Sequence, residues 1–575
     1  MLVLHSQPLK TSRNIILFIF YVVVQSCSPH PIDREHSQGQ ISSRGMVVTG
    51  HALATQVGLD VLNAGGNAYD AAIAVHYALS VVYPVAGNIG GGGFLVYRNA
   101  NGEIGSLDFR ETAPLNVSQE IFLDSIGNVK KGITSLGHLA CGIPGSVAGM
   151  DELYHKLGTL PFAKLIQPAI DLATDGYRLT RLGAAELNNN RDNFLAANAG
   201  DIFLTNKTWH EGDTIRFTDL ASTLSRIRDL GKAGFYEGAT AAMIVAEMTT
   251  GHGIITHEDL KKYRAVWREP IQAKFKNYNI ISMPPPSSGG IALAQLVKGS
   301  TAFDFGALAQ NSPRKIHIMT ELMRRVYADR ATYLGDPDFY NVPVTMLLDS
   351  AYIAERMSTI DTHKATPSSN IKQGKVDHIE SFQTTHYSIT DQWGNAVSVT
   401  TTLNNYFGSY VMVDGAGFFL NNEMDDFSVK PGIPNQFGLV GAMANSIEPG
   451  KRMLSSMSPT IIEKNGQLSM VLGTPGGSTI ITNVFQVFMN VAAYGMTMQE
   501  AVDAKKMHAQ WLPDEVILEE GMLDDLRLKE LEAYGHHLRT IPQIGRFGAI
   551  MLREDQTYEG AADITRSGDG TALGQ

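Results

Sequence analysis

The sequence predicts a globular protein that mixes helices with strands, of the α/β or α+β class. Apolar residues make up 44% of its 575 residues and charged residues only 18%, which allows a sizeable core. Helical and strand-like patterns are mixed throughout the chain. The length fits two to four ordinary domains or one large intertwined domain, and we find no internal repeat, low-complexity tract or long linker.

Two helical patterns stand near the start of the globular part. From His51 to Ala64 apolar residues fall at helical spacing, and Gly65-Gly66 is a stop signal. Tyr69 to Val82 is apolar nearly all round, which predicts a buried helix, and Pro84 ends it.

A third helix is predicted to open at Ser312-Pro313, an N-cap followed by a first-turn proline. We expect its apolar side chains to face inward and Arg324, Arg325 and Arg330 to face mostly outward. Strand patterns lie at Asn279–Ser282, Tyr387–Thr390, Ala396–Thr402, Met470–Leu472 and Ala549–Leu552, and residues 391–395 suit a turn between two of them.

The N-terminus has the features of an export signal. Lys10 and Arg13 precede an apolar run, Ile15 to Val24, which is too short to span a bilayer. The run ends at Ser26-Cys27 and resembles a bacterial lipobox, although Gln25 departs from the usual small residue. We expect residues 1–26 to be removed. Lipid on Cys27 would then anchor the protein to the cell envelope, and ordinary cleavage nearby would give a soluble periplasmic protein.

Charge and cysteine content exclude other classes. The net charge is −11 without any Lys/Arg run, which argues against nucleic acid as a partner. The only other cysteine, Cys141, sits among small and apolar residues, which predicts a buried, inert thiol. If Cys27 carries lipid, the chain can form no internal disulfide.

The stretch Gln383-Thr384-Thr385-His386-Tyr387-Ser388 is the most informative. A threonine hydroxyl is a poor nucleophile while it keeps its proton. One remedy uses the backbone amine of the same threonine as the base, which requires that threonine to become an N-terminus. Alone, a Thr-Thr pair that enters a β-rich stretch is ordinarily strand sequence.

Other segments carry residue types that bind charged groups, and each also has a plain structural reading. Glycine runs allow close packing, an arginine flanked by acids is ordinarily a surface ion pair, and an acidic cluster is ordinarily a solvated turn. No Lys-Ser/Thr follows the glycine run, no histidine stands at ligand spacing near the acids, and no Gly-x-Ser-x-Gly elbow occurs. The segments are Gly90–Gly93, Asp108–Thr112, Thr400–Asn404, Asn421–Asp426, Leu454–Thr460 and Gly473–Ser478.

In this order the motifs resemble those of γ-glutamyltransferases, from about Gly45 to the C-terminus. The resemblance implies an α+β fold of the N-terminal-nucleophile type, with two β-sheets between helical layers (αββα). It implies a precursor that cuts itself between Gln383 and Thr384. The products would be a large subunit of residues 27–383 and a small subunit of residues 384–575, held together as a heterodimer by a shared core.

The resemblance also implies the catalytic roles. Thr384 would be the nucleophile, Thr402 would hydrogen-bond it, and the amides of Gly476 and Gly477 would form the oxyanion hole. Thr479 replaces an arginine that some members carry. Residues 431–452 resemble the lid loop of many members.

The binding roles follow in the same way. Arg110, Ser455 and Ser456 would hold the α-carboxylate of a γ-glutamyl group, and Asn404, Glu423 and Asp426 its α-ammonium. The implied reaction transfers the γ-glutamyl group of glutathione to water, an amino acid or a peptide, without metal or organic cofactor.

Two alternatives stay open. A glutaryl or cephalosporin-type acylase of the same superfamily would take a group without an α-amine, and residues built for an ammonium would then face empty space. An inactive, unprocessed envelope protein would not need the full set of Thr384, Thr402, Gly476 and Gly477.

Overall fold

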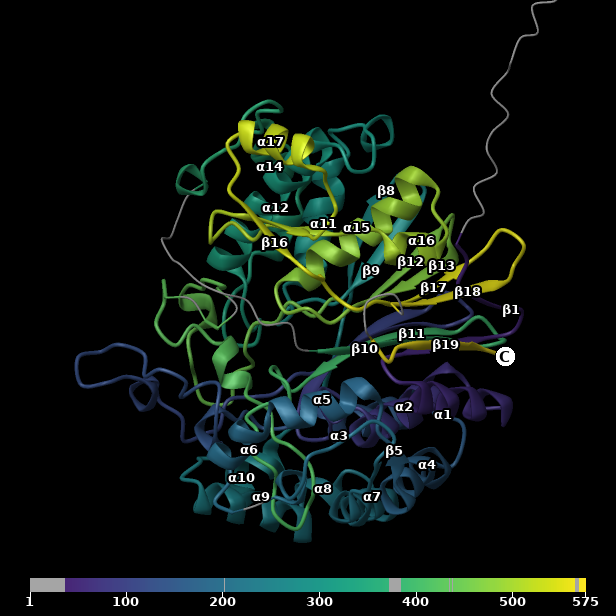
Figure 1. The fold of residues 1–575 in the computed structure, drawn as a ribbon, viewed down its shortest axis with the longest axis vertical. Coiled ribbons are helices and arrows are strands. Elements are labelled where there is room, and N and C mark those ends of the chain that lie inside the picture. The colour runs from purple at the N-terminus through teal and green to yellow at the C-terminus, as the bar shows by residue number, and fades with distance from the viewer. Residues whose placement is uncertain (1–36, 201, 372–383, 434, 437, 564–567) are drawn as a thin grey trace, which may run out of the picture. The chain divides into compact units, whose positions relative to one another are not determined.

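Two seven-stranded antiparallel sheets lie face to face at the centre of the fold, with helices outside both (Figure 1). The computed structural model describes residues 37–200, 202–371, 384–433, 435–436, 438–563 and 568–575. The fold therefore has the predicted αββα order of layers. Cys27, Gln383, Phe437 in the lid segment and Arg566 at the end of the family resemblance lie outside the described residues.

Strands distant in sequence alternate within each sheet. The first sheet has the order β1 (Gln40–Ser42), β18 (Tyr558–Ala562), β17 (Gly548–Leu552), β13 (Gln467–Leu472), β12 (Thr460–Lys464), β9 (Tyr278–Ser282) and β8 (Ile271–Phe275). The second has the order β19 (Thr571–Gly574), β2 (Met46–Thr49), β10 (Thr385–Thr390), β11 (Ala396–Thr402), β3 (Gly92–Arg98), β4 (Ile104–Phe109) and β7 (Val266–Arg268). Two small sheets join β14 (Met507–His508), β15 (Val516–Glu519) and β16 (Leu538–Ile541), and β5 (Tyr177–Arg178) with β6 (Thr214–Ile215).

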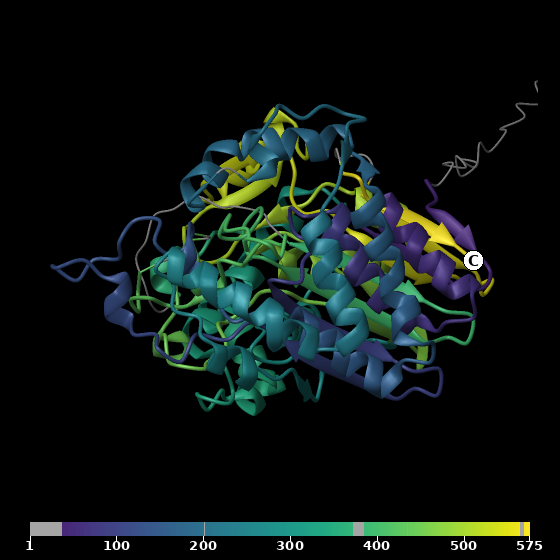
Figure 2. The same cartoon turned by 90° about the horizontal axis from the view of Figure 1, so that it is seen from below.

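Helices from the first half of the chain cover the second sheet (Figures 1 and 2). They are α1 (Ala52–Asn63), α2 (Ala68–Val82), α3 (Ser146–Leu157), α4 (Phe162–Asp175), α5 (Arg181–Asn189), α6 (Arg191–Ala197), α7 (Thr218–Leu230), α8 (Ala233–Tyr236), α9 (Gly238–Thr250) and α10 (His257–Lys262). Beyond the first sheet lie α11 (Gly289–Ser300), α12 (Pro313–Tyr333), α13 (Val344–Leu348), α14 (Ser350–Ser358), α15 (Thr479–Tyr494), α16 (Met498–Asp503) and α17 (Asp525–Ala533).

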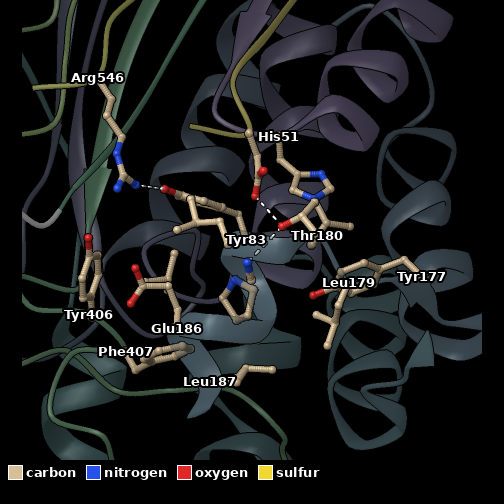
Figure 3. Close-up of a pocket in the computed structure, with 16 residues that line it drawn as sticks. His51, Tyr83, Tyr177, Leu179, Thr180, Glu186, Leu187, Tyr406, Phe407 and Arg546 are labelled. Atoms are coloured by element: carbon tan, nitrogen blue, oxygen red, sulfur yellow. Dashed lines mark hydrogen bonds between the residues drawn. The ribbon is translucent and has the colours of Figure 1, made fainter. Parts of the chain in front are cut away.

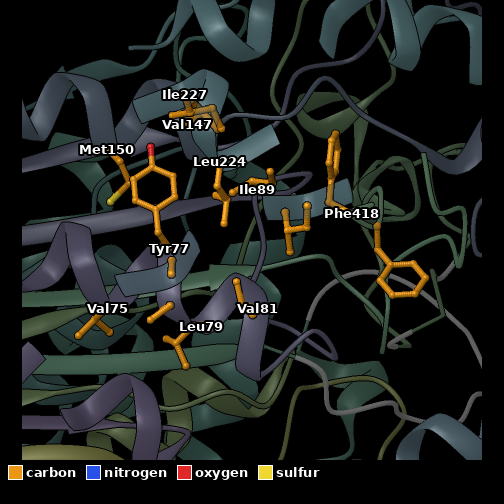
Figure 4. Close-up of a cluster of buried hydrophobic side chains, with 14 of the residues drawn as sticks. Val75, Tyr77, Leu79, Val81, Ile89, Val147, Met150, Leu224, Ile227 and Phe418 are labelled. Atoms are coloured by element: carbon orange, nitrogen blue, oxygen red, sulfur yellow. The ribbon is translucent and has the colours of Figure 1, made fainter. Parts of the chain in front are cut away.

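The two N-terminal helices form where the sequence predicts them. Asn67 and Asp70 make a capping box at the start of α2, and all 15 residues of that helix are buried, as its apolar pattern indicates. Valine, tyrosine and leucine side chains of α2 pack against α3 and α7 in one apolar cluster (Figure 4). This cluster fixes the helical layer on the second sheet.

Helix α12 begins as predicted, with the Ser312 hydroxyl accepting a hydrogen bond from the amide of Lys315. The expectation that its arginines face outward is wrong. Arg324 and Arg325 are buried because Glu321, on the same helix, pairs with them at 3.1 and 2.7 Å. Arg330 is buried as well, against two serines described below. Intrahelical ion pairs and hydrogen bonds thus allow charged side chains into the core.

The β10–β11 hairpin carries the Thr-Thr-His-Tyr-Ser run. The Asp391 carboxylate accepts hydrogen bonds from the amides of Trp393 and Asn395 and closes the predicted turn. Thr385 pairs with Thr401, so the next step of the register sets Thr384 level with Thr402. Between the two sheets the Ser388 hydroxyl donates to the carbonyl of Gly548 at 2.9 Å.

Cys141 is buried, as predicted, and burial raises the pKa of its thiol to about 12. Among the residues from 37 onward that the structure describes, no helix is long and apolar enough to cross a membrane.

Candidate active site

Apart from Gly476, all the predicted catalytic and binding residues line one pocket. The pocket holds about 330 Å³ of empty space, including its open mouth. Leu439, Met457, Ser478 and Ile480 complete the wall. Its residues come from both sheets and from loops that lie far apart in sequence: Arg110, Thr384, Thr402, Asn404, Glu423, Asp426, Ser455, Ser456 and Gly477.

Thr384 stands directly before β10 and only 7% of its surface is exposed. Thr402, the last residue of β11, lines the pocket beside it, and the Thr402 hydroxyl accepts a hydrogen bond from the amide of Asn404 at 2.7 Å. Since Gln383 lies outside the described residues, the predicted cleavage site is described only on its Thr384 side.

The Gly476-Gly477 pair follows β13 and precedes α15. Both residues have positive φ, +143° and +53°, which glycine adopts without strain. Among the described residues, neither amide donates to an acceptor within the protein. The Thr479 hydroxyl bonds the Gly476 carbonyl at 2.8 Å and holds the turn from the far side. Gly477 lines the pocket and Gly476 precedes it directly, and two such adjacent amides can stabilise an oxyanion.

Arg110 lies at the centre of a buried charge cluster. Its guanidinium is 2.7 Å from the carboxylate of Glu423, 2.5 Å from that of Asp426 and 3.5 Å from that of Glu111. All four side chains are wholly or largely buried. The charge of Arg330, beyond ion-pair distance, also acts on Asp426, so two cations face three acids in a site of low dielectric constant.

Burial and the charges of the neighbouring groups shift the pKa values of these acids. Burial raises the pKa of Glu423 and of Asp426 above the ordinary carboxyl value, against the opposing pull of Arg110. Burial likewise raises the pKa of Glu111. Burial alone would lower the pKa of Arg110, but the three carboxylates outweigh it and raise that pKa. A ligand that brings a further positive charge would relieve the imbalance.

The backbone of Arg110 is fixed by its neighbours. The amide of Arg110 donates to the Asp108 carboxylate at 2.9 Å, and the Tyr263 hydroxyl donates to the Arg110 carbonyl at 2.8 Å. Asp108 also pairs with Arg268 at 2.8 Å. The guanidinium is thus held by a buried network and need not order itself when a ligand binds.

Asn404 follows β11 in the left-handed region, with φ of +76°, a conformation that asparagine tolerates better than most residues. Its side-chain amide donates to the carbonyl of Asn422 at 3.0 Å, which directs the rest of the side chain along the pocket wall. Asn422 precedes the short 3-10 helix η6 (Glu423–Asp426), so this bond ties the strand end to the acidic residues.

Ser455 and Ser456 are held by the turn before α11 and by helix α12. The Ser455 amide donates to the carbonyl of Pro286 at 3.0 Å, and the Ser288 hydroxyl donates to the carbonyl of Ser455 at 2.7 Å. The guanidinium of Arg330 donates to the hydroxyls of Ser288 and Ser456, both at 3.0 Å. Arg330 is therefore a site residue that the sequence reasoning missed. Arg330 is one of several charged residues on α12, and nothing in its spacing pointed to Ser456.

The predicted lid segment closes on the acids. The Asn435 side-chain amide donates to the Asp426 carboxylate at 3.3 Å, and Gln436 accepts a hydrogen bond from Asn405 at 2.8 Å. Leu439 lines the pocket directly. This segment thus contacts the end of the pocket where Asp426 lies.

The Gly90–Gly93 run serves close packing rather than a phosphate. A Cβ on Gly91 would stand 2.1 Å from the carbonyl oxygen of Thr402, and one on Gly93 would stand 2.3 Å from that of Thr400. These glycines let β3 approach β11 at the end that carries Thr402.

Comparison with known proteins shows the family of this chain. A family model described as gamma-glutamyltranspeptidase matches residues 54–573. A glutathione hydrolase proenzyme of Escherichia coli (strain K12) is 46% identical over 541 residues, which cover 92% of this chain and 92% of that protein. The chain belongs to the γ-glutamyltranspeptidase family.

Acylases are similar as well. An acylase ACY 1 proenzyme of Pseudomonas sp. (strain SE83) is 34% identical over 549 residues, 92% of this chain and 94% of that protein. A crystal structure of a cephalosporin acylase from Bacillus halodurans superposes with a TM-score of 0.82 at 26% identity, covering 97% of this chain and 99% of that one. The γ-glutamyltranspeptidase fold is therefore shared with acylases, and the pocket residues must separate the two activities.

Proposed function

We propose that this protein is a self-processing γ-glutamyltransferase that hydrolyses glutathione and other γ-glutamyl amides. The charge pattern beside Thr384 carries the proposal. Arg110 and two serines offer a site for a carboxylate, while Glu423 and Asp426 bring more negative charge than Arg110 neutralises. A γ-glutamyl group bears both an α-carboxylate and an α-ammonium and complements this pattern.

The mechanism follows from the positions of these groups. Cleavage before Thr384 frees its amine, which takes the proton from the Thr384 hydroxyl as the oxygen attacks the γ-carbonyl. The amides of Gly476 and Gly477 stabilise the oxyanion, each such donor being worth roughly 3 kcal/mol. The amine of the leaving peptide takes the proton, and the C–N bond breaks. Water or a new amine then attacks the Thr384 ester and releases the γ-glutamyl group.

Ammonium recognition separates this proposal from the acylase alternative. The wild type should hydrolyse γ-glutamyl-p-nitroanilide with kcat/KM about a hundredfold or more above that for glutaryl-p-nitroanilide, since a glutaryl group lacks the ammonium that would balance the two buried acids. Arg110→Lys keeps a charge but loses the fork of donors, and it should lower kcat/KM for both anilides. Equal hydrolysis of the two anilides by the wild type would favour the acylase instead.

For localisation, we propose that residues 1–26 are an export signal and that Cys27 carries a lipid anchor. The charged start, the short apolar run and the Ser26-Cys27 junction support this. A fatty-acid probe should label the wild type in a bacterial host, and Cys27→Ser should abolish labelling while hydrolysis persists. Unlabelled wild-type protein in the periplasm would point to ordinary signal cleavage.

A further inference from the structure

A second cavity begins on the other flank of Thr384. Thr384, His386 and Pro475 line it together with Tyr83 and Arg546. Among the described residues, Thr384 alone lines both this cavity and the pocket that holds Arg110. The proposed nucleophile therefore stands between two spaces, and a γ-glutamyl group in one leaves the other facing the scissile bond.

A larger cavity lies next to the second one and shares part of its wall. Tyr83, Arg546 and Asp569 line both spaces, which hold about 380 and 460 Å³ including their mouths. The far part has mainly apolar walls (Figure 3), formed by Val82, Val85, Tyr177, Leu179, Leu187 and Phe407. We call the combined space the distal cavity. Such walls suit the side chain of a small peptide.

Arg546 lies two residues before β17 and lines the distal cavity. Its guanidinium donates to the Tyr83 hydroxyl at 3.2 Å (Figure 3), and its backbone amide donates to the Thr474 hydroxyl at 3.0 Å. Gly545 has φ of +75°, and a Cβ there would stand 2.8 Å from the Thr474 hydroxyl oxygen. These contacts fix Arg546 to the segment that carries Gly476 and Gly477.

The guanidinium of Arg546 keeps unused hydrogen-bonding capacity. Of its five N–H donors, only the one on Tyr83 has a partner among the described residues, and no carboxylate there lies within ion-pair distance. An arginine fork with free donors at a cavity wall suits a carboxylate.

Other charged groups also face the distal cavity. Glu186 points into it (Figure 3), and burial raises the pKa of that carboxyl while Arg546 lowers it. Asp569 accepts a hydrogen bond from the Thr180 hydroxyl at 2.6 Å. Burial lowers the pKa of His51 to about 4, so its ring is neutral near pH 7. In its charged form Glu186 would repel a carboxylate held by Arg546, because both line the same cavity.

We propose that the distal cavity binds the peptide that leaves from, or attacks, the acyl group on Thr384, and that Arg546 binds the C-terminal carboxylate of that peptide. The inference rests on the proposed γ-glutamyl transfer. In the attack, the peptide amine forms a C–N bond to the γ-carbonyl carbon and the bond to Thr384 Oγ breaks. The amine proton passes to that oxygen. The apolar walls take the side chain of the peptide, and Arg546 sets its direction.

The test compares glutathione with its C-terminal amide, in which the glycine carboxylate is neutral. Glutamate release gives kcat/KM for each, and the ratio of free acid to amide is the readout. The wild type should favour the free acid by about tenfold to a hundredfold, the range for a hydrogen-bonded charge pair. Arg546→Gln should bring the ratio near one, and Arg546→Lys should restore part of it.

Glu186→Gln should change the ratio of free acid to amide in the opposite direction. Removal of its repulsion should raise the ratio by about twofold to fivefold, the scale of an exposed charge pair. Tyr83→Phe should lower the ratio partway, because Arg546 loses a hydrogen-bond partner. Arg553→Gln is the matched control: Arg553 follows β17 at the other end and pairs with Asp555, so the ratio should stay at the wild-type value.

Several results would overturn the assignment. One is a wild-type ratio near one. Another is an unchanged ratio in Arg546→Gln, and a third is a lower ratio in Glu186→Gln. If Arg546→Gln failed to fold, Tyr83→Phe and Glu186→Gln would decide. A wild type that releases no glutamate from either peptide would instead contradict the proposed γ-glutamyl activity.

Discussion

At Arg110 a single guanidinium meets three buried carboxylates, and their arrangement explains how one short pocket can recognise a zwitterion. The acids are close enough to Arg110 to be neutralised in part, and burial keeps their pKa values raised. A substrate ammonium would stabilise their charged forms, and a substrate carboxylate would share Arg110 with them. The binding energy of both charges then depends on the protonation of Glu423 and Asp426.

This coupling predicts a pH dependence of substrate binding. A carboxyl with a raised pKa takes up its proton at higher pH than an ordinary one, so acidification should neutralise Glu423 and Asp426 before ordinary carboxyls and raise KM for γ-glutamyl-p-nitroanilide. Asp426→Asn should raise KM about tenfold or more at pH 7.5 and flatten its rise on acidification. An equally steep rise in Asp426→Asn would contradict the role of this acid.

Strand β10 shows how an element holds the nucleophile in place. His386 is buried on this strand, and its ring nitrogens lie 2.9 Å from the hydroxyl of Thr400 and 3.0 Å from that of Ser388. Burial lowers the pKa of His386 to about 3, so the ring is neutral and can exchange hydrogen bonds with both hydroxyls. Gly473, at the end of β13, leaves the room that this ring occupies.

A methyl group at Gly473 should therefore disturb β10. A Cβ there would stand 2.2 Å from the His386 ring, an overlap that typically costs about 1–3 kcal/mol. Gly473→Ala should lower the thermal unfolding midpoint and slow cleavage of the precursor. Gly548→Ala is the matched control, because its Cβ would lie 3.6 Å from the same ring. Equal behaviour of the two variants would show that Gly473 packing does not position the strand.

For the whole molecule, both sheets interleave strands from either side of the proposed cut. In the second sheet β10 and β11 lie between β2 and β3, and in the first sheet β12 pairs with β9. Backbone hydrogen bonds of two sheets and the cores around them therefore join residues before 384 to residues after it. Separation of the two parts would expose both cores.

After cleavage the two fragments should therefore stay associated. The purified wild type should give two bands on a denaturing gel and one species on native size exclusion, and the small fragment should begin with Thr384. Thr384→Ala should stay a single chain and lose hydrolysis, because it lacks the nucleophile. A fragment that begins at any other residue would contradict the nucleophile assignment.

The sequence by itself determined the local elements and the family. The buried helix α2, the Ser312 cap and the β10–β11 turn rest on neighbouring residues, so their patterns sufficed to predict them. The tertiary structure alone decided which distant residues share a wall. Arg330 lies beside Ser456, and Arg546 beside Tyr83, because sheets and helices bring those segments together. The spacing of residues along the chain does not predict such contacts. A charged side chain such as Arg330 is buried only where the fold brings a partner to it, and here that partner is distant in sequence.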